Sequence, residues 1–416
     1  MMKQRRQLIE NIFSMVTLRG MEYVLAFLLV PYLLRTLGPE NYGAIAFMQG
    51  IISYFNLVIN YGFNLTAPKD IALAEREELP RIFSEYFWGT FFLFLLCSVV
   101  FGIGYFILNI LFGISLDIPL FLACYMTAVG GVVFPVWFFQ GIQEMRYITI
   151  LNLLGRLITM ALLFYLIQSP KDYIKAAFLQ SCTTVFAGLF SWYIIYKDWP
   201  RILRTPMIKD VWTVYKKGWP IFLSSVAVNL YTSSDVVILG ALTNPVTVGY
   251  YSGSEKLINC IRRGVGAVSD AIYPYITQKL KDSPSMAYQF LRKQLLFYAM
   301  GGIFLGLIVI LFSPAIVPWL LGDQYIPSIE PLQIMAFVPF MVAVSTVFGY
   351  ETMLPLGLQQ IYSRVLIAAS LVNLALIVPA ILWKGALGVA GCVMITETFI
   401  TVVMGVFLCK KRILLN

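Results

Sequence analysis

Hydrophobic residues fill this 416-residue chain in twelve long stretches, which short polar segments separate. A membrane-spanning helix needs about 20 mostly apolar residues, and each stretch is long enough. Because backbone groups in lipid must be hydrogen-bonded internally, the pattern favours helices. It predicts an all-α polytopic membrane protein with twelve transmembrane helices. The predicted spans cover residues 12–36, 44–66, 83–112, 118–139, 148–169, 174–196, 218–242, 247–276, 294–321, 332–354, 362–383 and 386–409.

Composition agrees with this class, since 59% of the residues are hydrophobic, only 12% are charged, and the mean hydropathy is +0.80. No gap between predicted spans is long enough for a sizeable soluble domain. The chain has no phosphate-binding G-x-x-x-x-G-K-[ST] motif, so we expect no built-in ATPase.

The net charge of +9 could suggest nucleic acid, but the positions of the 30 Lys and Arg residues explain it otherwise. With the N-terminus inside, most of these residues fall in the predicted cytoplasmic segments. The outer segments hold Arg35, Lys171, Lys175 and Lys384. This bias follows the positive-inside rule and predicts that both termini are cytoplasmic. We expect no nucleic-acid partner.

The longest polar stretch, residues 197–217, lies near the midpoint and predicts a cytoplasmic linker between two six-helix lobes, 1–196 and 218–416. Two turns support an internal repeat: R-T-L-G-P-E-N-Y-G at 35–43 and A-L-T-N-P-V-T-V-G-Y at 241–250. Pro39 and Pro245 lie 206 residues apart, and so do Gly43 and Gly249. Because an even number of spans precedes the second lobe, both lobes begin inside, which is a parallel repeat.

Cysteine and histidine usage excludes several kinds of site. The six cysteines all lie in or at the end of predicted spans, and the chain contains no histidine. We therefore expect no disulfide framework, no metal site built on cysteine or histidine, no histidine proton relay and no cofactor.

The predicted eighth span is the most polar, and its charges form two stripes. Lys256, Arg263 and Asp270 are seven residues apart and share a helix face, with Asn259 beside them, while Glu255 and Arg262 form a neighbouring stripe. Charges inside a membrane are costly and usually face a cavity or pair with one another. The stripes predict a water-filled cavity; packing against charges on other helices is the alternative.

Other predicted spans also carry charges. Arg19 and Glu22 are three residues apart on the first span, where they could simply neutralise one another, and Arg156 lies on the fifth. Basic groups in a cavity suit an anionic substrate, because arginine binds phosphate in a bidentate manner. Candidate substrate-binding residues are Arg19, Arg156, Lys256, Asn259, Arg262 and Arg263.

Carboxylates within spans are the candidate carriers of a coupling proton or cation, because histidine is absent. The alternative is pairing with a basic group on a neighbouring helix. These candidates are Asp235, Glu351 and Glu397, together with Glu22 and Asp270.

Four short motifs occur in order along the chain. They are P-Y-L-L-R-T-L-G-P-E-N-Y-G at 31–43, Y-G-F-N-L-T-A at 61–67, P-V-W-F-F-Q-G at 135–141 followed by E-M at 144–145, and A-I-Y-P at 271–274. In these motifs, and over essentially its whole length, the chain resembles the Wzx-type O-antigen flippases of the polysaccharide transporter family.

The resemblance implies the fold of the multidrug/oligosaccharidyl-lipid/polysaccharide exporters, in which two six-helix lobes surround a central cavity. It also implies a substrate, undecaprenyl-pyrophosphate-linked oligosaccharide, that moves from the cytoplasmic to the periplasmic leaflet. A polysaccharide polymerase and a chain-length regulator would be partners. The related lipid II flippase has cavity arginines on its first and eighth helices, and Arg19 and Arg262 or Arg263 are counterparts by helix. A drug antiporter of the same superfamily and a membrane polysaccharide polymerase are the alternatives.

Overall fold

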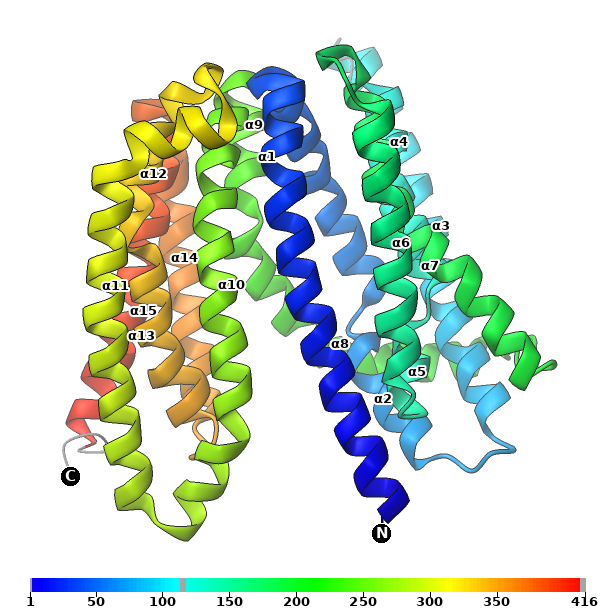
Figure 1. Ribbon diagram of the computed structural model, residues 1–416. Coiled ribbons are helices and arrows are strands. Elements are labelled where there is room, and N and C mark those ends of the chain that lie inside the picture. The colour runs from blue at the N-terminus through cyan, green and yellow to red at the C-terminus, as the bar shows by residue number, and fades with distance from the viewer. Residues whose placement is uncertain (1, 113–116, 412–416) are drawn as a thin grey trace. The chain divides into compact units, whose positions relative to one another are not determined.

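The computed structural model describes residues 2–112 and 117–411. Within these ranges, the side chains of residues 2–24, 26, 108–109, 111–112, 227–228, 231–232, 267, 270–271, 274 and 281 lie outside the description. The described backbone forms helices and turns and contains no strand, which confirms the predicted all-α class (Figure 1).

Contacts between residues divide the chain into two compact units. The first contains residues 1–29 and 48–229, and the second contains residues 30–47 and 230–416. These units group residues by packing and not by repeat, so the six-helix lobes stay a prediction. The middle of the first helix belongs to the second unit because it packs there.

The first unit is built from the following helices. They are the outer parts of α1 (Met2–Asn60), then α2 (Phe63–Leu73), α3 (Leu79–Phe112), α4 (Ile118–Val133), α5 (Val136–Gly141), α6 (Met145–Leu166), η1 (Pro170–Asp172), α7 (Tyr173–Asp198) and most of α8 (Ile208–Thr232). Helix α7 packs between α4 and α6. An aromatic core that includes Phe63, Phe83, Tyr86, Trp137 and Phe138 holds this unit together.

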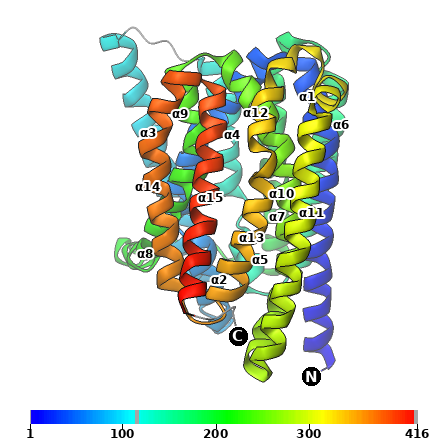
Figure 2. The same ribbon diagram turned by 90° about the vertical axis from the view of Figure 1, so that its left-hand side faces the viewer.

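The second unit is built around the long helices α10 and α11. Its elements are α9 (Ser234–Leu242), α10 (Pro245–Asp282), α11 (Pro284–Leu321), η2 (Asp323–Ser328), α12 (Ile329–Ile334), η3 (Met335–Phe337), α13 (Val338–Thr346), η4 (Val347–Met353), α14 (Gln359–Lys384) and α15 (Ala386–Lys410). Helices α14 and α15 run side by side, as Figures 1 and 2 both show.

Helix boundaries follow local chemistry. Helix α4 starts where the Asp117 carboxylate accepts a hydrogen bond from the Leu120 amide at 3.0 Å. Helix α10 starts in the same way, because Oδ1 of Asn244 accepts a hydrogen bond from the Thr247 amide at 2.9 Å. Helix α1 changes direction at Gly38, whose φ of 75° leaves the helical region.

Nine helical segments among the described residues are long and apolar enough to cross a membrane. The predicted spans outside these nine are largely helical too: 12–36 lies within α1, 218–242 covers α8 and α9, and 247–276 lies within α10. Helix α10 is less apolar because five charged residues occur between 255 and 270. The predicted linker 197–217 is partly helical, since α8 begins at Ile208.

Candidate functional site

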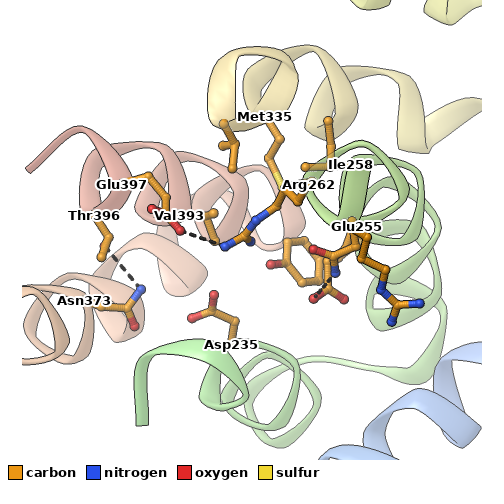
Figure 3. Close-up of a pocket in the computed structure, with 13 residues that line it drawn as sticks. Asp235, Glu255, Ile258, Arg262, Met335, Asn373, Val393, Thr396 and Glu397 are labelled. Carbon is orange, nitrogen blue, oxygen red and sulfur yellow. Dashed lines mark hydrogen bonds and ion pairs between the residues drawn. The ribbon is translucent and has the colours of Figure 1, made fainter. Parts of the chain in front are cut away.

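A cavity of about 280 Å³ lies within the second unit and is lined by α9, α10, η3, α13, α14 and α15 (Figure 3). Helix α10 contributes the longest row of lining residues. These are Tyr251, Glu255, Ile258, Asn259, Arg262 and Arg263. Their spacing of one, three or four residues is that of one helix face, so the helical period alone brings the polar groups together.

The centre of the cavity is an ion pair between helices that lie far apart in sequence. Arg262 on α10 donates a hydrogen bond from Nη2 to Oε1 of Glu397 on α15, at 3.0 Å. The side chain of Glu397 is only 9% exposed and that of Arg262 is 30% exposed. Removing one member of such a pair leaves the other charge poorly solvated, so the two side chains hold each other in place.

A second carboxylate faces the pair. Asp235 on α9 is buried, and its Oδ1 has no hydrogen-bond partner among the described residues. Asn373 on α14 lies beside it and donates from Nδ2 to Oγ1 of Thr396 at 3.4 Å. Figure 3 shows Asp235 pointing from α9 toward the middle of the cavity, opposite Arg262 and Glu397.

Asn259 completes the polar lining and donates from Nδ2 to Oε1 of Glu255 at 3.2 Å. Arg263 lies at the cavity as an exposed side chain. If all described lining groups are ionised, three carboxylates face two guanidinium groups. The cavity therefore already balances most of its own charge, and an entering anion must compete with Glu397 for Arg262.

The structure brings together five of the predicted site residues: Asp235, Asn259, Arg262, Arg263 and Glu397. Other predicted residues lie elsewhere. Lys256 lies near the buried Tyr42 and does not line this cavity, Arg156 lies on α6 in the first unit, and Glu351 lies in η4. The side chains of Arg19, Glu22 and Asp270 lie outside the described residues.

Asn373 and Thr396 are polar lining residues on α14 and α15 that were not among the predicted site residues. The available signal was an amide in the predicted span 362–383 and a hydroxyl next to Glu397. Because polar residues of this kind also face other helices, only the helix rotations distinguish them.

The fold, with its long apolar helices, defines a multi-pass helical membrane protein. The chain resembles the lipid II flippase MurJ in an inward closed conformation, with a TM-score of 0.72 and 13% identity over 98% of this chain and 90% of that one. It also resembles an inward-facing MATE family multidrug transporter, with a TM-score of 0.65 and 16% identity over 95% and 94%. At these identities the likeness concerns the fold.

Sequence comparison then identifies the family. The family model described as "Polysaccharide biosynthesis protein" matches residues 8–280, so the chain belongs to this family. A protein of Escherichia coli (strain K12) named "Putative O-antigen transporter" is 29% identical over 413 residues, which is 97% of each chain.

Proposed function

We propose that this protein is a flippase that moves undecaprenyl-pyrophosphate-linked oligosaccharide, such as an O-antigen repeat unit, from the cytoplasmic to the periplasmic leaflet. The observation that carries the proposal is the guanidinium pair Arg262 and Arg263 at a cavity within a membrane-spanning unit. Membership of the polysaccharide biosynthesis family and the name of the E. coli relative support the substrate class. The relative's name also supports a transporter over an enzyme.

The Arg262–Glu397 ion pair suggests how a diphosphate would bind. A diphosphate offers Arg262 a bidentate partner, which binds more strongly than Glu397 does through the single hydrogen bond that it accepts from Arg262. Once displaced, Glu397 would be a poorly exposed carboxylate without its counter-charge, and it would take up a proton or a cation. Anion binding and cation binding would therefore be linked at this site.

The remaining predicted residues have supporting roles in this proposal. Asn259 would hydrogen-bond the head group, and Arg19, Lys256 and Arg156 would attract the anion. Asp235 and Glu351, and also Glu22 and Asp270, would share the coupling role. The prenyl tail would remain in lipid, because its transfer into a polar cavity is unfavourable.

Alternating access would come from rocking of the two predicted lobes, 1–196 and 218–416, about the linker. The protein would work in the bacterial inner membrane with both termini in the cytoplasm, as the distribution of Lys and Arg predicts. A polysaccharide polymerase and a chain-length regulator would act on the delivered units.

One observation favours a second candidate, a cation-coupled multidrug antiporter. The carboxylates Asp235, Glu255 and Glu397 outnumber the guanidinium groups in the described lining, and acidic walls suit a cationic drug. The two functions predict opposite effects of removing the arginines.

Complementation tests the proposal. The wild-type chain would be expressed in a Gram-negative strain that lacks its own O-antigen flippase but makes the matching repeat unit, with surface O-antigen as the readout. We expect wild type to restore O-antigen and the R262A/R263A double variant to lose it at equal membrane abundance. Arg364→Ala, at an exposed position on α14, is the matched control and should behave as wild type.

Failure of wild type to restore O-antigen in the strain that owns the gene would contradict the proposal. The same cells would be exposed to cationic dyes. Dye resistance that needs the carboxylates and survives the loss of both arginines would favour the antiporter instead.

A further inference from the structure

Glu351 is a fully buried carboxylate that lies apart from the cavity. Its side chain is 0% exposed, and it is not among the residues that line the cavity. It lies in η4, a π-helical turn over Val347–Met353 that packs against α10, α11, α14 and α15. Because π-helical turns are rare and often occur at functional sites, the surroundings of this carboxylate need a physical explanation.

Few groups satisfy the Glu351 carboxylate. Gln294 on α11 donates from Nε2 to its Oε1 at 3.1 Å, and the Ser269 hydroxyl on α10 lies next to it. The nearby Thr352 hydroxyl is already used, because it donates to the Val347 carbonyl oxygen at 2.7 Å. The described contacts of Glu351 are therefore with neutral groups.

Several oxygens in this cluster have no hydrogen-bond partner of standard geometry among the described residues. They are Oε2 of Glu351, Oε1 of Gln294 and Oγ of Ser269, and all three side chains are at least nine-tenths buried. The hydroxyl of Tyr298, one helical turn beyond Gln294 on α11, also has no hydrogen-bond partner among the described residues. Buried polar atoms without partners are uncommon in native proteins, and an ion or water that binds there is the usual reason.

Charge points to an ion. Among the described Lys and Arg side chains, none forms an ion pair with Glu351. An unpaired buried carboxylate is strongly unfavourable, and an amide partner compensates only a part of that cost. By contrast, Glu397 in the same unit has its guanidinium partner.

The donor set selects the ion. A proton on Oε2 of Glu351 would leave Oε1 of Gln294 without a partner, whereas a hard metal cation takes several oxygen ligands at once. One carboxylate balances one positive charge. We propose that Glu351, Gln294 and Ser269 form a binding site for a monovalent metal cation of the sodium type.

The site is connected to the cavity through α10, since Ser269 and Arg262 are seven residues apart on that helix. Cation binding would fix α10 against η4 and α11, and thereby set the position of the arginine. Binding itself does not depend on the proposed function, but its use as the coupling site rests on that function.

Binding of ²²Na⁺ to the purified full-length protein tests the proposal, with scintillation proximity as the readout. We expect saturable binding by wild type, and at least tenfold weaker binding by Glu351→Gln, which keeps the shape and removes the charge. Gln294→Leu should weaken binding as well. Glu330→Gln removes an exposed carboxylate on α12 and should bind as wild type does.

A second measurement controls for misfolding. The melting temperatures of wild type and of E330Q should be higher in sodium than in potassium. The melting temperature of E351Q should be the same in both salts. Absence of saturable ²²Na⁺ binding by folded wild type would overturn the proposal. Undiminished binding by E351Q would also overturn it, and loss in Asp235→Asn would then assign the ion to the cavity. Sodium binding without O-antigen complementation would support the binding site and contradict only its role in coupling.

Discussion

Gly43 on α1 and Gly249 on α10 pack against each other's helices in a reciprocal manner. A methyl group on Gly43 would overlap the carbonyl oxygen of Pro245, and a methyl group on Gly249 would overlap that of Pro39. These are the same prolines and glycines that align the two turns of the predicted repeat. Small residues allow helix backbones to approach this closely in membrane proteins.

This contact predicts that Gly43→Ala and Gly249→Ala each destabilise the second unit. The added carbon has no room beside rigid backbone, and overpacking typically costs about 1–3 kcal/mol. The measurement is the melting temperature of the purified protein. Gly104→Ala on α3 is the matched control, because nothing lies within 4 Å of its added carbon. If the alanine variants at 43 and 249 had the same melting temperature as the control, the two helices could move apart without loss of stability, which would contradict the prediction.

The Arg262–Glu397 pair predicts strongly non-additive variants. Arg262→Met leaves Glu397 buried without its partner, and breaking a buried pair costs up to about 3–5 kcal/mol. Because Arg262 is 30% exposed, we expect the lower end of that range. The double variant R262M/E397M should recover most of the lost stability, since no uncompensated charge remains.

A double-mutant cycle on melting temperature measures this coupling. O-antigen complementation by the same variants separates stability from function, because the double variant should be stable yet inactive. Additive destabilisation by the two single variants would contradict an energetically coupled pair.

Membrane orientation predicts which engineered cysteines a membrane-impermeant thiol reagent can reach. The six native cysteines carry free thiols, so they would first be replaced. Lys171→Cys lies at an exposed position that should face the periplasm, and Lys209→Cys lies at an exposed position that should face the cytoplasm. In intact spheroplasts the reagent should label only the first, and after lysis it should label both. Labelling of Lys209→Cys in intact spheroplasts would reverse the predicted topology.

The sequence alone determined the class of this protein. Twelve apolar stretches of spanning length are enough to predict an all-helical membrane protein, because lipid leaves a backbone few ways to satisfy its hydrogen bonds. The row of polar residues on α10 was also predictable, since residues at helical spacing share a face wherever the helix lies.

Tertiary structure decided which charges meet. The sequence contains Arg262 and Glu397 135 positions apart, and only the packing of α10 against α15 makes them partners. It likewise placed Asp235 and Asn373 at the cavity and left Lys256 outside its lining. Helix rotation and packing depend on side-chain fit along whole interfaces, so no local pattern records them. Glu351 shows the same limit: its span was apparent from hydropathy, but its burial among oxygens without partners follows only from the fold.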